Sequence, residues 1–350
     1  MNAGRPSTTR LHWYWVVGAT LVLIVAVIAG VMVGPIALSP VDIMASIINR
    51  VPFVSLDTEL SVRDEAILWE IRMPRVILGV LVGSMLSAAG ASYQGVFRNP
   101  LADPYLLGAG AGAGLGATIA IVYAPATSSW IVDPLPLAAF VGAIGGVALA
   151  YVLGYTVRSG RTAVTLILAG VAVASFLTAL QTFLQQRDSD TLREVYGWIL
   201  GSLNTAGWGD VALIAPYVAV CLSVVFIGRR LLDILAVGDT EAGTLGVRPG
   251  RVRLIFVIFA TLGTAAVVSV SGLIGFVGII VPHTVRLLTS ASYRVVIPLS
   301  ILVGGAFLVV ADIIARVAIS PGEIPIGVVT ALIGAPFFAV VLRTSKGVVS

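Results

Sequence analysis

The chain has 350 residues, of which 58% are apolar and only 11% are charged. Ordinary soluble domains carry roughly 25% charged residues, so this composition excludes a soluble fold and indicates a chain embedded in lipid. Basic residues exceed acidic ones by 21 to 17. They are scattered through short loops, so we attribute them to membrane orientation and expect no nucleic-acid partner.

The first apolar segment runs from Trp13 to Val33. It is longer than the roughly 7–15 apolar residues of a signal peptide. We therefore predict a retained first helix, preceded by a cytoplasmic tail at residues 1–12.

Nine further apolar segments follow, separated by charged residues or by clusters of Pro and Gly. A helix needs about 20 apolar residues to cross a bilayer, so we predict an all-α polytopic membrane protein, a single domain of about ten transmembrane helices. The stretch 271–278 is the weakest boundary, because only glycine-rich sequence separates the seventh and eighth segments. The ten segments lie at residues 13–34, 75–96, 106–124, 135–156, 164–185, 209–228, 254–271, 274–290, 296–314 and 326–343.

The loops between these segments predict the orientation of the chain. Ten crossings place both termini on one side, and the positive-inside rule makes that side cytoplasmic. The outer stretches 35–71 and 187–207 are too polar to cross, and each is expected to hold a short amphipathic helix. Fourteen cations fall on the inner side: Arg5, Arg10, Arg98, Arg158, Arg161, Arg229, Arg230, Arg248, Arg251, Arg253, Arg286, Arg294, Arg343 and Lys346.

Small residues recur at helical spacing inside two of the segments. Such ladders let helix backbones approach closely in lipid, and close packing is the interpretation that we favour over hinges. The ladders are Gly79, Gly83, Ser87 and Ala91 in the second segment, and Gly142 and Gly146 in the fourth.

The fifth segment carries Thr178, Gln181, Thr182 and Gln185 at a spacing of three and four residues, which places them on one helix face. Amides facing hydrocarbon would lack hydrogen-bond partners. This face therefore lines a cavity, as a translocation path would, or bonds to a neighbouring helix.

Ionisable, nucleophilic and metal-ligating residues are scarce in the apolar segments. Asp312 is the only candidate for an ionisable group deep in a segment, which disfavours ion-coupled transport. No Walker-A motif occurs, because the only lysine, Lys346, follows Ser345 rather than glycine. Cys221 is the only cysteine, so we expect no disulfide, and no metal or catalytic site is expected in the chain. An intramembrane hydrolase built from Ser271 and His283, or from His283 with Asp312 and Glu323, is the rival from another class.

Several long motifs carry a resemblance to a known family. They are IRMPRVILGVLVGSMLSAAGASYQGVFRNPLADPYLLGAGAGAGLGA at 71–117, SVSGLIGFVGIIVPHTVRLL at 269–288 and ADIIARVAISPGEIPIGVVTALIGAPFFAVVL at 311–342. With RTAVTLILAGVAV at 161–173 and WILGSLNTAGW at 198–208, they resemble the permeases of iron-chelate and cobalamin ABC importers. The resemblance implies a type II ABC importer fold in the bacterial plasma membrane.

The resemblance also implies partners and a cargo. Such permeases form homodimers, with two cytoplasmic ATPase subunits below and one extracytoplasmic binding protein above. ATP and Mg²⁺ would be bound by the ATPase subunits, and this chain would bind no cofactor. A ferric siderophore is the first expected cargo, with cobalamin and haem as alternatives. A secondary transporter is the other rival reading.

Site residues follow from the matching motif positions. Arg72, Arg75 and Arg316 match arginines that dock the binding protein through its glutamates. The alternative is pairing within the chain, with Glu70 or Glu323, or simple snorkelling at a helix end. Asn99, Pro100 and Leu101 match a cytoplasmic gate, with an ordinary connecting loop as the alternative. The opposing gate segment would lie near 162–165.

The longest inner loop, residues 229–253, matches the segment that seats in the ATPase subunit. A solvated cytoplasmic loop is the alternative. The residues expected at the ATPase contact are Gly238, Asp239, Glu241, Ala242, Leu245 and Gly246.

Overall fold

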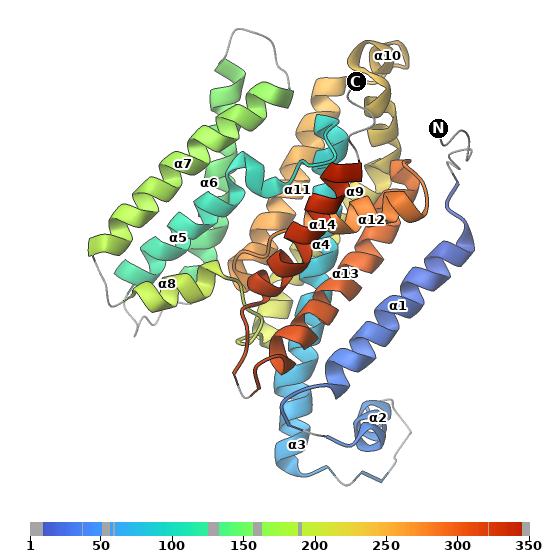
Figure 1. Ribbon diagram of the computed structural model, residues 1–350, viewed down its shortest axis with the longest axis vertical. Coiled ribbons are helices and arrows are strands. Elements are labelled where there is room, and N and C mark those ends of the chain that lie inside the picture. Colours follow the sequence, from blue (N-terminus) through green and yellow to red (C-terminus); the bar gives the residue numbers. More distant parts are fainter. Residues whose placement is uncertain are drawn as a thin grey trace.

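The computed structural model describes residues 10–36, 38–50, 57–58, 60–124, 133–156, 163–187, 191–320 and 322–344. Within them the chain forms one elongated bundle of helices (Figure 1). Seven helices are long and apolar enough to cross a membrane: α1 (Trp13–Met32), α4 (Met73–Phe97), α6 (Pro134–Thr156), α7 (Ala163–Arg187), α9 (Trp208–Val237), α11 (Pro249–Ser271) and α13 (Tyr293–Val317).

Three shorter apolar helices complete the set: α5 (Ala109–Tyr123), α12 (Val277–Leu288) and α14 (Ile326–Thr344). Each of the ten predicted segments overlaps one of these ten helices, which confirms the predicted all-α polytopic fold. The remaining elements are short: α2 (Pro40–Ile48), α3 (Val62–Ala66), the π-helical turn η1 (Ile67–Arg72), the 3-10 turn η2 (Pro104–Leu107), α8 (Leu192–Ile199) and α10 (Asp239–Thr244).

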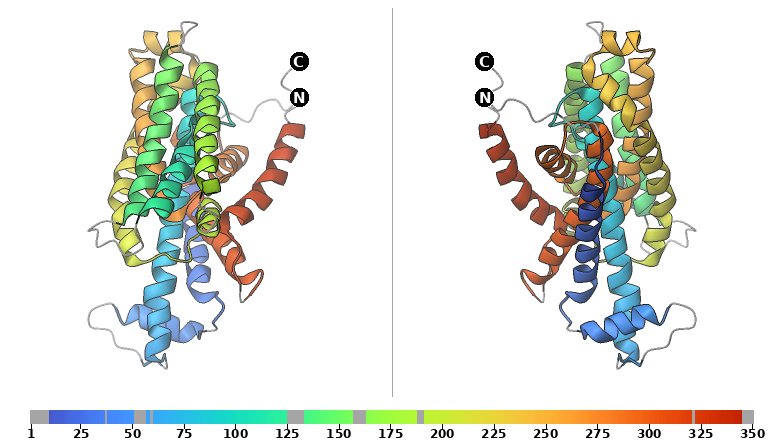
Figure 2. Two further views of the ribbon diagram at one scale, coloured as in Figure 1. Left: turned by 90° about the vertical axis from the view of Figure 1, so that its left-hand side faces the viewer. Right: turned by 90° about the vertical axis from the view of Figure 1, so that its right-hand side faces the viewer.

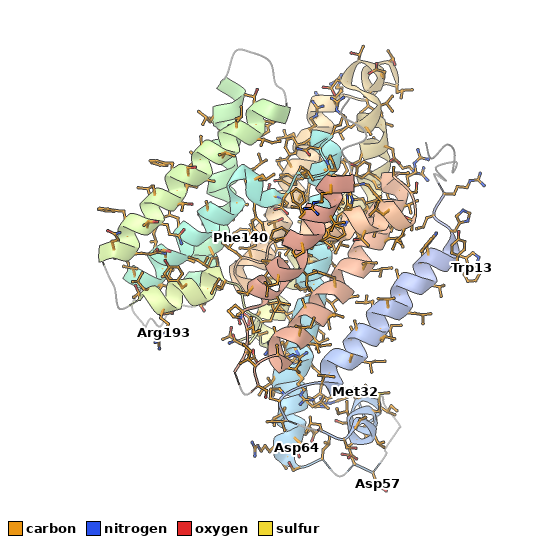
Figure 3. All side chains as sticks on the ribbon, viewed as in Figure 1. Trp13, Met32, Asp57, Asp64, Phe140 and Arg193 are labelled. Atoms are coloured by element: carbon orange, nitrogen blue, oxygen red, sulfur yellow. The ribbon has the colours of Figure 1, made fainter. Side chains whose placement is uncertain are left out.

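The two ends of the bundle differ as the loop charges predict. α10 lies at one end and α2 and α3 lie at the other (Figure 1). Trp13 and Met32 mark the two ends of α1, and the acidic Asp57 and Asp64 lie at the Met32 end (Figure 3). The α10 end is therefore cytoplasmic. Of the predicted inner cations, Arg5, Arg158, Arg161 and Lys346 lie outside the described residues.

α4 is the central helix of the bundle. With α3 and η1 it forms one helical run of 36 residues, Val62–Phe97, which is about 54 Å long and so projects beyond a hydrocarbon core of about 30 Å. α4 packs against α9, α11, α12 and α13. A Cβ added to Gly83 would collide with the carbonyl oxygen of Gly304 in α13, so the small-residue ladder lets these two backbones touch.

Glycines bring α5 and α6 together in the same way. A Cβ on Gly112 would collide with the Gly142 carbonyl, and a Cβ on Gly146 would collide with the Gly108 carbonyl. The predicted role of Gly142 and Gly146 in close packing is confirmed.

The chain between α11 and α12 is non-helical at residues 272–276, where Gly272 and Phe276 have φ of 66° and 68°. Irregular backbone at membrane depth requires partners within the protein. The Tyr105 hydroxyl lies 3.3 Å from both the nitrogen and the oxygen of Ile274, and the Ser202 nitrogen donates to the Ser271 oxygen. The glycine-rich stretch is thus a true break, and α12 spans only about 18 Å.

α14 leans away from the rest of the bundle (Figure 2). Its first residues are attached to the segment after α8: the Ile326 nitrogen donates to the Gly201 oxygen and the Gly327 nitrogen to the Leu200 oxygen. Further along, Leu332 and Val340 are exposed. α14 is therefore anchored at its beginning, and part of its apolar surface is left uncovered.

Candidate functional site

A cluster of buried charges lies at the extracytoplasmic end of α4 and α13. The Asp312 carboxylate lies between two guanidinium groups, 2.8 Å from Arg75 Nη2 and 3.1 Å from Arg316 Nε. Arg75 also donates both Nη groups to Glu323, at 3.0 and 2.9 Å. Asp312 is thus held in an ion-pair network with Arg75 and Arg316.

The guanidinium groups of Arg72 and Arg316 bind backbone carbonyls at the C-terminal end of α1. Arg72 Nη1 donates to the carbonyl oxygens of Val31 and Met32 at 2.9 and 3.0 Å. Arg316 donates to the Gly30 and Val33 oxygens, both at 3.0 Å. The last carbonyls of a helix lack intrahelical partners and carry partial negative charge. These two arginines therefore cap the C-terminus of α1.

All three predicted docking arginines are therefore buried, with exposed fractions of 4% for Arg72, 6% for Arg75 and 2% for Arg316. This differs from the expectation of outward-facing cations, because carboxylates and helix-end carbonyls surround them. Pairing with Glu323 matches the alternative drawn from the sequence, whereas Glu70 is not the partner. Their docking role stays a prediction.

The polar face of α7 borders a cavity of about 420 Å³. All four predicted path residues line it: Thr178, Gln181, Thr182 and Gln185. Gln181 is 7% exposed, yet its Nε2 has no hydrogen-bond partner among the described residues. A buried amide without a partner is costly, so the Gln181 side chain is incompletely satisfied in the single chain.

Other segments complete the cavity. Tyr105 and Gly110 come from the η2–α5 region, Tyr196 from α8, and Leu273 and Gly275 from the break before α12. Among the described residues the lining carries no charged side chain, and its polar groups are amides and hydroxyls. Sequence reasoning missed Tyr105 and Tyr196, because only the fold brings these distant segments to α7.

The predicted gate residues form a tight turn directly after α4. The Asn99 side chain accepts a hydrogen bond from the Leu101 nitrogen at 2.9 Å, and the Ala102 nitrogen donates to the Asn99 carbonyl oxygen. A side chain that bonds its own backbone two residues on stiffens a turn. The gate role stays a prediction. Of the opposing segment near 162–165, residue 162 lies outside the described residues and the rest forms the start of α7.

Residues 229–253 are mostly helical. α9 continues to Val237, α10 follows, and α11 begins at Pro249. Within α10, Ala242 is fully buried, whereas Leu245, just after it, is 64% exposed. Gly238 and Gly246 flank the element with φ of 142° and 78°, a backbone region that favours glycine.

Asp239 is bound within the chain. Its carboxylate accepts from Arg98 Nη2 at 2.6 Å and from Arg253 Nη1 and Nη2 at 2.9 and 2.6 Å. Of the predicted ATPase contacts, Asp239, Glu241 and Leu245 have exposed side chains, and the Asp239 carboxylate is the one bound by arginines of the same chain. The contact itself stays a prediction.

The residues of the rival hydrolase are engaged elsewhere. Ser271 Oγ donates to the Val267 oxygen at 2.8 Å, His283 packs edge-on against Phe337, and Asp312 binds the arginines described above. Among the described residues no three His, Cys, Asp or Glu side chains gather to hold a metal ion.

Comparisons with known proteins agree with this arrangement. The model of the FecCD transport family matches residues 22–344. A cobalamin import system permease protein of Halobacterium salinarum is 42% identical over 80% of this chain and 74% of its own. An Fe(3+)-citrate import system permease protein of Bacillus subtilis is 36% identical over 81% and 83%.

A solved structure described as a metal-chelate type ABC transporter, in an inward-facing conformation, superposes with a TM-score of 0.81. It is 28% identical and covers 95% of this chain and 100% of that one. The family match spans most of the ten apolar helices, the cavity and the gate turn. This chain therefore belongs to the FecCD transport family.

Proposed function

We propose that this chain is the membrane-spanning subunit of an ATP-driven importer, and that a metal chelate crosses the membrane along the polar face of α7. The observation that carries this is the cavity lined by Thr178, Gln181, Thr182 and Gln185. The exposed hydroxyls of Thr178 and Thr182 supply a polar surface that can exchange hydrogen bonds with a passing solute, and Gln181 lies between them on the same face. The names of both relatives describe permeases of chelate importers.

The proposed cargo is a ferric siderophore, with cobalamin as the second candidate. Neutral amides and hydroxyls line the cavity, and they suit a large chelate whose surface carries carbonyl, amide and hydroxyl groups. Weak neutral contacts also let the cargo leave the path again. The relative at 42% identity, named for cobalamin import, is the observation that favours the second candidate.

A second copy of the chain would close the path. Thr178 and Thr182 are exposed in the single chain, and so are the apolar Phe176 and Phe183 on the same helix. Hydroxyls left in lipid would lack partners other than their own helix. A homodimer that covers α7 and the outward-leaning α14 removes that exposure and makes the cavity part of a shared conduit.

Two ATPase subunits and one extracytoplasmic binding protein complete the proposed assembly. The 350 residues contain no Walker-A sequence, so hydrolysis falls to a separate chain that contacts Glu241 and Leu245. The binding protein would approach the Arg75 cluster. There Glu323, with a side chain 29% exposed, holds the place that a carboxylate of the binding protein would take.

Substitution of Gln181 tests the path. The chain, its ATPase and its binding protein are reconstituted in liposomes, and ATP-dependent uptake of a ferric hydroxamate and of cobalamin is measured. Gln181→Leu removes the amide at similar volume and is expected to lower uptake about tenfold, because an unmatched polar contact is worth roughly one factor of ten. Gln186→Leu, on an exposed position of the same helix, is the matched control.

The outcomes separate the parts of the proposal. Loss of uptake in Gln181→Leu alone supports a path along α7, and the chelate that is taken up identifies the cargo. Equal uptake by the wild type, Gln181→Leu and Gln186→Leu proteins would place the path elsewhere. If the complete assembly accumulates neither chelate, the cargo assignment fails.

A further inference from the structure

One ionic cluster joins three segments at the cytoplasmic end. Asp239 is the first residue of α10, Arg98 directly follows α4, and Arg253 lies near the start of α11. Arg98 Nη2 and Arg253 Nη2 both lie 2.6 Å from Asp239 Oδ1, and Arg253 Nη1 lies 2.9 Å from Oδ2. Both carboxylate oxygens are thus occupied by guanidinium groups of the same chain.

The cluster reaches the gate turn through two contacts with the end of α4. Arg253 Nε donates to the Val96 oxygen at 3.3 Å, which ties α11 to the last turn of α4. Arg98 has left-handed backbone angles, φ 51° and ψ 35°, and its carbonyl leads directly into Asn99. A non-glycine residue in this region is strained, so a partner that holds the Arg98 side chain helps to keep this backbone in place.

The gate turn itself is stiff. Asn99 Oδ1 accepts a hydrogen bond from the Leu101 nitrogen at 2.9 Å, and the Ala102 nitrogen donates to the Asn99 carbonyl oxygen. A displacement of Arg98 is therefore passed to Leu101 instead of being absorbed between them. α10 and the turn are connected by one side-chain contact and one short, rigid segment of backbone.

We propose that Asp239 is a positioning residue that couples α10 to the gate turn 99–101 through Arg98. In this arrangement Arg253 fixes the orientation of the Asp239 carboxylate. This rests on the proposed function, in which the ATPase seats against α10. Asp239 then acts inside the permease, and the ATPase contact is made by the exposed Glu241 and Leu245. The bidentate Arg253 pair fixes the orientation of the carboxylate, which a single exposed ion pair does not do.

Stability alone does not explain the cluster. The side chains of Arg98 and Asp239 are 41% and 46% exposed, and ion pairs with that exposure contribute little to folding. Their effect is to specify the relative position of α10 and α4. A substitution here is therefore expected to uncouple the two elements while the chain stays folded.

The first experiment uses hydrogen exchange and needs no cargo. Peptides covering 239–246 and 99–103 are followed in the full-length permease, with and without its ATPase subunit. In the wild type, ATPase binding is expected to slow exchange in both segments. In Arg98→Gln, protection at 239–246 is expected to remain while protection at 99–103 is lost.

Arg251→Gln is the matched control, because Arg251 is exposed in the first turn of α11 and lies two residues from Arg253. It should behave as the wild type. If Arg98→Gln and the wild type respond identically at 99–103, the coupling role of Asp239 is overturned. If the wild type shows no protection at 239–246, the ATPase contact fails, which is a failure of the proposed function and a different result.

The second experiment measures transport per ATP hydrolysed in liposomes with ATPase and binding protein. Arg98→Gln and Asp239→Asn are each expected to lower this ratio about fivefold or more, in the range of coupling between linked sites, with ATPase subunits still bound. The double variant should fall no further, since both changes break one link. Additive losses, or loss of the ATPase from Asp239→Asn, would contradict the proposal.

Discussion

Asp312 illustrates how a buried charge is tolerated in this bundle. Its side chain is 2% exposed and lies between Arg75 and Arg316, and Glu323 balances the second positive charge. Arg72 and Arg316 also satisfy carbonyls at the end of α1. These few residues join α1, α4, α13 and the segment before α14 at the extracytoplasmic end, so the cluster holds together the surface that a binding protein would meet.

Removal of the central charge should destabilise the fold. Asp312→Asn leaves two buried guanidinium groups short of one negative charge, and breaking a buried ion pair costs about 3–5 kcal/mol. The expected result is a clear fall in the thermal unfolding temperature in detergent. Asp57→Asn, at an exposed position, should leave it unchanged; equal stability of both variants would show that the network is not needed.

Glu323 offers a test of docking that keeps the fold. Glu323→Gln retains the shape of the side chain but removes its charge, while Asp312 still binds Arg75. If a carboxylate of the binding protein takes this place, the variant should bind that protein more tightly than the wild type, in surface plasmon resonance with nanodisc-embedded permease. Unchanged or weaker binding would show that Arg75 does not take part in docking of the binding protein.

The helices show a second level of organisation, in which small residues decide which backbones touch. Gly142 in α6 faces the Gly112 carbonyl, whereas a Cβ on Gly145 would meet nothing within 4 Å. The same helix thus carries one glycine that packing requires and one that it does not. α5 and α6 can associate without large apolar side chains, as expected where lipid gives no hydrophobic drive.

This contrast predicts opposite outcomes for one substitution. Gly142→Ala should lower the free energy of unfolding by about 1–3 kcal/mol, the usual cost of overpacking. Gly145→Ala should be neutral or stabilising, because alanine is the better helix former by about 1 kcal/mol. Steric-trap or detergent unfolding measures both, and similar losses in the two variants would refute the packing role of Gly142.

Hydropathy alone locates the ten apolar helices, because segments that cross lipid have to be apolar, but it does not predict that the eighth run begins with a non-helical break and leaves α12 short. It also predicts the polar face of α7, since Thr178, Gln181, Thr182 and Gln185 share one helix and local spacing suffices. The partners of Arg75 are different: Asp312 and Glu323 lie 237 and 248 residues away, and no local pattern connects them. For the same reason the sequence does not predict that Tyr105 meets the break after α11, or that Arg98 meets Asp239.

As a whole, the molecule is a bundle with a structured surface at each end and a neutral polar cavity between them. The extracytoplasmic end carries the buried ion-pair cluster, and the cytoplasmic end carries α10 and the gate turn. In the described membrane-spanning helices the buried acid is neutralised by arginines, which leaves no evident ion-binding group to drive uphill movement. Under the proposed function, energy for accumulation enters through the cytoplasmic end.

Uptake by proteoliposomes that contain the purified chain, with and without its ATPase and binding protein, measures this dependence directly. Accumulation of the chelate against its gradient is expected only with both partners and ATP, and ion gradients across the chain alone should drive none. Uphill accumulation by the chain alone would show that it carries its own source of energy and would contradict its assignment as a passive conduit.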